Sequence, residues 1–166
     1  VWLLLRPLAY KVHPYQWATI GKEVAHIENA TMDDVKEFFF RFYCPDNAIM
    51  TVAGNVNSEN VFELAEKWFG EIKRKIAPRV PYKAEPVQTE ARSLTVERDI
   101  PFDSIYMAYH CCSRLDPEFY AVDLLTDILS RGKSSRLYNS LLKEKKLFTE
   151  INAYQTSDFD KSLLII

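Results

Sequence analysis

Apolar and polar positions in the first half of the chain predict two amphipathic helices separated by a buried strand. After Thr31, apolar side chains recur every three or four residues, which predicts a helix with one apolar face (Val35, Phe38, Phe39, Phe42). Thr31 and Asp34 have the spacing of a capping box, so the helix should begin there. The apolar run 48–53 predicts a buried strand. A second helix should begin at Asn57 or Ser58 and end at Gly70.

Two other stretches of the first ninety residues show no sustained periodicity. Residues 1–30 are interrupted by Pro7, Pro14 and Gly21, which predicts irregular structure. Several prolines lie among basic and polar residues after Lys73, which predicts an extended linker. We therefore place a subdomain boundary near residue 85. The predicted parts are the end of a first subdomain (1–77), a Pro-rich linker (78–91) and the start of a second subdomain (92–166).

The second half predicts strands followed by helices and then strands again. Strand patterns cover 93–100 and 104–109, and Asp116 followed by Pro117 predicts a capped helix start. One helix should follow from Pro117 and another from about Ser134, before a pair of strands (150–156, 161–166). Strict alternation of strand and helix is missing after residue 85, which argues against a doubly wound parallel sheet. The expected fold is α+β, with a mixed, largely antiparallel sheet and helices packed on one face.

Composition narrows the classes of partner. The 166 residues contain 21 Lys and Arg against 23 Asp and Glu, so the net charge is -2 and nothing favours binding to nucleic acid. The four glycines are isolated from one another, so the chain has no phosphate-binding glycine loop. No apolar run reaches the ~18 to 20 residues of a membrane span. The chain starts without Met and finishes on the apolar run 163–166, which is typical of a piece of a longer protein, truncated at both ends.

The residue types that carry catalysis are present but do not form a catalytic pattern. None of the three histidines, His13, His26 and His110, lies in a zinc-binding H-x-x-E-H or H-E-x-x-H frame. Cys111 and Cys112 follow His110 directly, but neighbours on a strand point to opposite faces, so we expect buried and inert thiols. Three cysteines cannot build a disulfide framework and should be free. We predict no catalytic residue and no metal ligand from these patterns.

Short motifs nevertheless occur along the chain in a fixed order: HPYQW at 13–17, ATMDD at 30–34, PDNA at 45–48, VAGNV at 52–56, WFG at 68–70 and LSRGKSSRLY at 129–138. Their order and spacing resemble the pitrilysin, insulinase and mitochondrial processing peptidase family of zinc metallopeptidases. The resemblance covers roughly residues 10–166. Each motif alone is weak, whereas their joint occurrence in this order is specific.

The resemblance implies a non-catalytic piece of a zinc endopeptidase. In the family, an H-x-x-E-H helix and a later glutamate bind zinc and activate water, and all of them precede the His-Pro-Tyr segment. Here that segment is already at residue 13, so Glu23 and Glu28 should not be ligands. The chain resembles the family's inactive domain, with the processing-peptidase fold. No cofactor is expected in this piece and zinc is expected in the parent. The implied partners are the zinc-bearing domain of the same parent, a second homologous half or subunit, and a peptide substrate.

Two basic residues are the candidates for substrate binding. The family's second half carries an Arg and Tyr pair that holds substrate, and here Lys143 takes the place of the arginine while Thr149 takes that of the tyrosine. Lysine lacks the planar fork of arginine, so the pair is not intact and the chain fits the zinc-bearing half better. Arg136, within the SSRLY motif, is the other candidate, although Ser134, Ser135 and Arg136 also suit an ordinary helix start.

Two alternatives remain at this point. The parent could be a zincless member of the same family that acts in assembly or substrate presentation, and the sequence preceding Val1 would decide this. An unrelated α+β binding module could also share these motifs. For the compartment, we favour the bacterial periplasm or cytoplasm over the mitochondrion, although no residue decides it.

Overall fold

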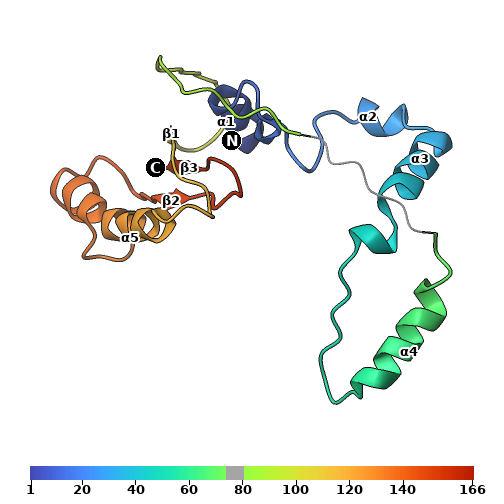
Figure 1. The fold of residues 1–166 in the computed structure, drawn as a ribbon. Coiled ribbons are helices and arrows are strands. Elements are labelled where there is room, and N and C mark those ends of the chain that lie inside the picture. Colours follow the sequence, from blue (N-terminus) through green and yellow to red (C-terminus); the bar gives the residue numbers. More distant parts are fainter. Residues whose placement is uncertain (74–80) are drawn as a thin grey trace. The chain divides into compact units, whose positions relative to one another are not determined.

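The computed structural model describes residues 1–73 and 81–166, which form two compact units. Unit 1 combines Val1–Thr19 with Lys83–Ile166, and unit 2 is Ile20–Tyr82. Unit 1 contains these elements: α1 (Trp2–Ala9), η1 (Pro14–Gln16), β1 (Ala108–His110), α5 (Phe119–Ser130), the π-helical η3 (Tyr138–Glu144), β2 (Tyr154–Gln155) and β3 (Leu163–Ile165). Unit 2 contains α2 (Ala25–Glu28), α3 (Met32–Phe42), η2 (Pro45–Asn47) and α4 (Ser58–Phe69) (Figure 1).

Unit 1 is built on a three-stranded antiparallel sheet with the order β1-β3-β2. Ala108 lies opposite Ile165 across β1 and β3, and Tyr154 lies opposite the same Ile165 across β2 and β3. Helix α5 packs against β2, and α1 packs against β1 (Figure 1). The core lies where α1 meets β3, at Ala9, Tyr10, Leu163 and Ile165. The α+β fold with an antiparallel sheet is therefore confirmed.

The first helix was missed by the sequence analysis. Residues 1–30 were expected to be irregular, but Trp2–Ala9 is helical in spite of Pro7 inside it. A proline removes only one hydrogen bond of the helix, and tertiary contacts can offset that cost. Here Lys11 Nζ donates to the Pro7 carbonyl, and a guanidinium nitrogen of Arg92 donates to the carbonyls of Leu8 and Ala9, so the C-terminal end of α1 is capped by side chains.

The helix starts predicted in unit 2 are confirmed, and the strand between them is not. Thr31 and Asp34 form the full capping box of α3, and the Asn57 side chain accepts from the first N–H groups of α4. Residues 48–53 belong to no strand among the described residues, and Ile49 is 97% exposed. A strand needs a neighbour that takes up its backbone hydrogen bonds, and unit 2 offers none within its described residues.

Several predictions for the second half also change. Residues 93–100 are not assigned to a strand, and only the end of the expected strand 104–109 is part of β1. Helix α5 begins at Phe119 without a side-chain cap, because Asp116 accepts from the Ser113 N–H instead. The helix expected from Ser134 begins at 136. The paired strands near the C-terminal end of the chain are confirmed in shortened form as β2 and β3.

The predicted subdomain ranges, 1–77, 78–91 and 92–166, remain a prediction. Part of the first two ranges, 74–80, lies outside the described residues. The compact units group the residues differently, because Val1–Thr19 packs with the C-terminal half of the chain. Within the described residues, no helix combines the length and the apolar character that a membrane crossing requires.

Candidate functional site

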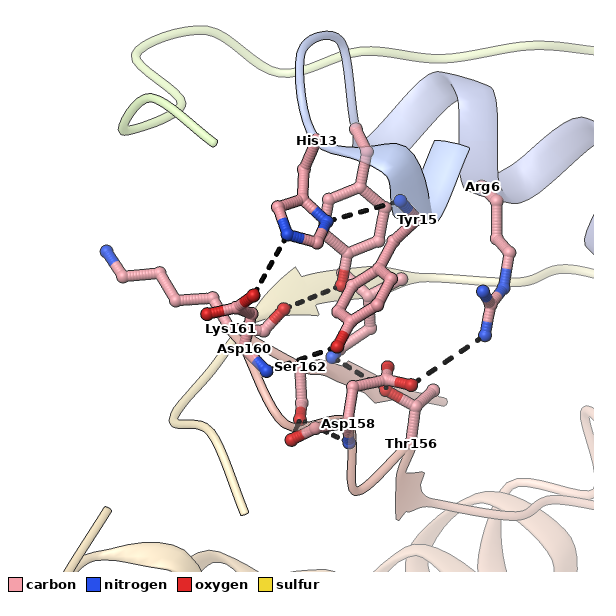
Figure 2. Close-up of polar contacts among 10 residues, drawn as sticks. Arg6, His13, Tyr15, Thr156, Asp158, Asp160, Lys161 and Ser162 are labelled. Atoms are coloured by element: carbon pink, nitrogen blue, oxygen red, sulfur yellow. Dashed lines mark hydrogen bonds and ion pairs between the residues drawn. The ribbon is translucent and has the colours of Figure 1, made fainter. Parts of the chain in front are cut away.

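A cluster of polar and aromatic side chains joins the start of the chain to the loop between β2 and β3. We call it the hairpin cluster (Arg6, Tyr10, His13, Tyr15, Thr156, Asp158, Asp160, Ser162). Figure 2 shows the side chains of the N-terminal segment pointing at the loop that carries the two aspartates. These contacts connect residues about 150 positions apart, so they hold unit 1 together.

His13 is a buried histidine whose ring nitrogens both face a partner. Nδ1 accepts the N–H of Tyr15 at 3.2 Å, and Nε2 lies 3.0 Å from Oδ2 of Asp160. Because Nδ1 accepts a hydrogen bond from a backbone donor, the proton of the neutral ring lies on Nε2 and points to Asp160. A general base needs an unengaged nitrogen within reach of the proton it removes. The arrangement therefore positions the chain rather than performing catalysis.

Tyr10 is the centre of the cluster and is 1% exposed. Its hydroxyl donates to the Lys161 carbonyl at 2.8 Å, and its ring makes edge contacts with Tyr15 and His110. Burial raises the pKa of the Tyr10 phenol, and the nearby Asp158 carboxylate adds to the increase. The phenol is thus held in its protonated form and acts as a structural hydrogen-bond donor.

The loop that receives Tyr10 and His13 is ordered by its own side chains. The Thr156 hydroxyl donates to Asp158 at 2.5 Å, and the Ser162 hydroxyl accepts from the Asp158 N–H at 2.9 Å. Arg6 approaches Asp158 at 4.0 Å, the outer limit of an ion pair. Ser157 has a φ of 56°, a left-handed conformation that an L residue adopts only where its surroundings fix it. The local hydrogen bonds provide that fixation.

A second anchor ties residues 83–92 to the end of α1. The Glu85 carboxylate is buried and accepts three backbone N–H groups, those of Lys11, Val12 and His13, each at 2.8 Å. Burial alone would raise the pKa of Glu85, but the three hydrogen bonds outweigh it and hold this pKa below its usual value. Arg92 binds the carbonyls at the end of the same helix. Residues 86–91 are therefore anchored at both ends.

A groove lies between this anchored segment and the outer edge of the sheet. We call residues 86–91 the strap. The strap forms one wall and β1 (Ala108–His110) the other, Lys161 also lines the groove, and the groove is an open one with a volume of about 500 Å³. The groove contains no catalytic arrangement, since its titratable side chains are limited to Glu90, Tyr109, His110 and Lys161.

The two adjacent cysteines are free thiols, as predicted, but they are half-buried and not fully buried. Burial raises the pKa of Cys111 to about 11, and the neighbouring Cys112 adds to this. His110 directs Nε2 to the Ala9 carbonyl at 3.0 Å. A thiol with this pKa is almost entirely protonated at neutral pH, so the chemistry of a nucleophilic thiol-imidazole pair is not supported.

The candidate substrate-binding residues lie elsewhere in unit 1. Arg136 and Lys143 are exposed, at the start and near the end of the helical stretch that contains η3, and neither lines the groove. In the turn before them, Gly132 has a φ of 77° and its carbonyl accepts the Ser135 hydroxyl. Ser135 therefore serves the helix start. A substrate-binding role of Arg136 and Lys143 stays a prediction.

Zinc does not fit the described residues. Among residues 1–73 and 81–166, no group of three or more His, Cys, Asp or Glu side chains could hold a metal ion. Both nitrogens of His13 face other partners, and His110 is directed at a carbonyl. We therefore derive no step through a metal from this chain.

Sequence reasoning missed the two acidic residues that organise unit 1. Glu85 lies in a Pro-rich stretch interpreted as a linker, and Asp160 lies in a turn between strands. Neither residue has a local partner that a pattern could reveal, because their contacts are 72 and 147 positions away. The His-Pro-Tyr motif was the only sequence pattern that pointed to this site. It singled out His13 but did not predict what His13 contacts.

Comparisons with known proteins give consistent results. Residues 29–166 match the family described as the Peptidase M16 inactive domain. The zinc protease PqqE of Helicobacter pylori is 35% identical over 161 residues, which are 95% of this chain and 36% of that protein. The uncharacterized zinc protease YmxG of Bacillus subtilis is 25% identical over 98% of this chain and 39% of its own length.

Solved structures show the same fold. A protease from Helicobacter pylori is similar with a TM-score of 0.78 and 32% identity, over 99% of this chain and 40% of that one. A peptidase M16 inactive domain from Pseudomonas fluorescens is similar with a TM-score of 0.70 over 98% of this chain and 39% of that one, and its 21% identity supports the fold alone. This chain thus spans about two fifths of the length of the proteins it matches.

Proposed function

From the premise that this chain belongs to the peptidase M16 family, we propose that it supports the zinc-bearing domain of a zinc metalloendopeptidase and walls the chamber that holds the peptide substrate. The observation that carries the proposal is the match of residues 29–166 to the inactive domain, together with a 35% identical relative named a zinc protease. The catalytic residues would then lie in another part of the protein.

The surface of unit 2 supports a structural role beside another domain. Among its described residues only Cys44 is buried, whereas large apolar side chains of α3 and α4 are exposed (Val35, Phe38, Phe39, Leu64, Trp68). Apolar patches of this kind mark surfaces that pack against a partner. We propose that the partner is the zinc-bearing domain of the same protein. Segment 48–53, which joins no strand among the described residues, would pair with a strand of that domain. A second homologous half or subunit would close the chamber.

The alternative is a zincless subunit that acts in assembly or substrate presentation. Zinc content separates the two functions. We expect about one zinc per molecule of the longer protein that contains this chain, and none bound specifically by the 166-residue chain measured in parallel. Cleavage of an unstructured peptide by the longer protein, abolished by a chelator and restored by zinc, would support the peptidase. Zinc on neither protein would favour the zincless subunit, and specific zinc on the 166-residue chain would overturn the proposal.

A further inference from the structure

We propose that the groove between the strap (86–91) and β1 binds an extended peptide as an additional strand, with an acidic side chain of the peptide near Lys161. This inference rests on the proposed function, because it names the surface of the chain that a peptide in the chamber would contact. It is argued from the backbone groups of the two walls and from the charge at the groove.

The β1 wall exposes unused backbone groups. Met107 exchanges two hydrogen bonds with Ile166 at 2.9 Å each, and the Cys111 N–H donates to the Ser162 carbonyl. In an antiparallel pair such bonds occur at every second residue, so Met107, Tyr109 and Cys111 face β3. The N–H and C=O groups of Ala108 and His110 therefore point to the other side, where no hydrogen bond occupies them among the described residues.

The strap wall is similar in its backbone. Among the described residues, the only hydrogen bond that uses the backbone of 86–91 is the one from the Gln88 side chain to the Glu90 carbonyl, at 2.7 Å. Glu85 and Arg92 hold its ends in place, so the strap is kept apart from β1 and does not pair with it. A peptide strand placed between the two walls would find hydrogen-bonding groups on both of its edges, as in recognition by strand addition.

The charge of the groove selects the peptide. Lys161 is exposed and forms no ion pair among the described residues, and it lines the groove beside His110 and Tyr109. Glu90, on the strap, is the only carboxylate of the lining. A peptide that carries one acidic side chain on the side of β1 would pair with Lys161 and keep that carboxylate away from Glu90. Such pairs at a surface add selectivity more than affinity.

Hydrogen exchange of single amides tests the geometry, with the 166-residue chain and a synthetic octapeptide of alternating Val and Thr that contains one Glu. In the free chain we expect the amides of Ala108 and His110 to exchange fast and that of Tyr109 slowly, because only Tyr109 faces β3. Saturating peptide should slow the first two by about tenfold or more, as expected for a new backbone hydrogen bond of about 1.4 kcal/mol, and leave Tyr109 unchanged. Protection of other surfaces and not of these two amides would overturn the inference.

Two matched comparisons test the chemistry by fluorescence anisotropy of the labelled peptide. Methylation of every second peptide nitrogen removes the donors of one edge and should weaken binding about tenfold. Lys161→Glu should weaken binding of the Glu peptide about fivefold, while Lys36→Glu on α3 should leave it unchanged. If the methylated and unmethylated peptides bound with equal affinity, the peptide would not bind as an added strand and the inference would be overturned. Formation of a dimer that excludes the peptide would assign the groove to a second copy and also overturn the inference.

The outcome is separable from that of the proposed function. If the longer protein contains zinc and cleaves peptides while Ala108 and His110 remain unprotected, the groove proposal fails and the proposed function stands. If the amides are protected and the longer protein holds no zinc, the groove binds peptides in a protein that is not a zinc peptidase.

Discussion

The Oε2 atom of Glu85 lies 2.8 Å from the backbone nitrogen of His13, and this contact joins positions 72 residues apart. The same carboxylate also accepts the N–H groups of Lys11 and Val12. Three consecutive backbone donors that leave the end of a helix would be costly to bury without an acceptor. One acidic side chain thus accepts hydrogen bonds from backbone N–H groups that have no acceptor nearby in the sequence. The same contacts fix the start of the strap.

Replacement of Glu85 should destabilise unit 1. Glu85→Ala leaves three backbone donors without their acceptor, so we expect a loss of about 2 to 3 kcal/mol in the free energy of unfolding, and a smaller loss for Glu85→Gln. Urea denaturation followed by circular dichroism measures both. Glu90→Gln, on the exposed part of the strap, serves as the control and should change stability by less than about 0.5 kcal/mol. Equal effects at positions 85 and 90 would contradict the anchoring role.

The stability that Glu85 contributes should depend on pH. Its pKa is lowered in the folded chain relative to the usual value of 4.5, so the folded state favours the charged carboxylate. The contribution is therefore fully present above about pH 4.5 and is lost as the pH falls through the lower pKa of the folded state. The difference in unfolding free energy between the unmodified chain and Glu85→Gln should shrink between pH 6 and pH 3. A constant difference over this range would refute the assignment.

The ring of His13 should carry a proton on Nε2 and none on Nδ1. Nitrogen NMR of the labelled chain at pH 7.5 should show Nδ1 unprotonated, because it accepts the Tyr15 N–H. We expect His13→Ala to cost about 2 kcal/mol, since it removes a buried ring and leaves a backbone donor unpaired. Asp160→Asn should cost less than about 1 kcal/mol, because the Asp160 side chain is 60% exposed. A proton on Nδ1, or a larger effect at Asp160 than at His13, would contradict this geometry.

Cys111 should react slowly with alkylating agents at neutral pH. With a pKa of about 11, only about one thiol in ten thousand is ionised at pH 7, and the thiolate is the reactive form. In a chain with Cys44→Ser and Cys112→Ser, burial alone still raises the pKa of Cys111, so its rate of reaction with iodoacetamide should keep rising at a pH where that of an unfolded peptide is already constant. The peptide Ala-Tyr-His-Cys-Ser serves as an unfolded control and should level off near the ordinary thiol pKa. If the reaction rate of the chain reached its plateau at the same pH as that of the peptide, the pKa of Cys111 would not be raised.

Local sequence patterns were sufficient for the helices of unit 2 and for the fold class. Thr31 with Asp34, and Asn57 with the N–H groups that follow it, form their hydrogen bonds within three residues, so neighbouring residues contain all the information required. The antiparallel pairing of β2 and β3 also follows from two strand patterns joined by a short loop. The family was recognised from the order of short motifs, which does not depend on knowledge of contacts.

Tertiary structure decided what depends on partners distant in sequence. Helix α1 forms in spite of Pro7 because Arg92 and Lys11 cap it, whereas the apolar run 48–53 forms no strand among the described residues because unit 2 has no strand beside it. The same holds for Glu85 and Asp160, whose partners lie far away in the sequence. It also holds for the outer edge of β1, which faces the strap only in the folded chain. A pattern along the chain shows which groups need a partner, but only the folded arrangement determines whether that partner is present.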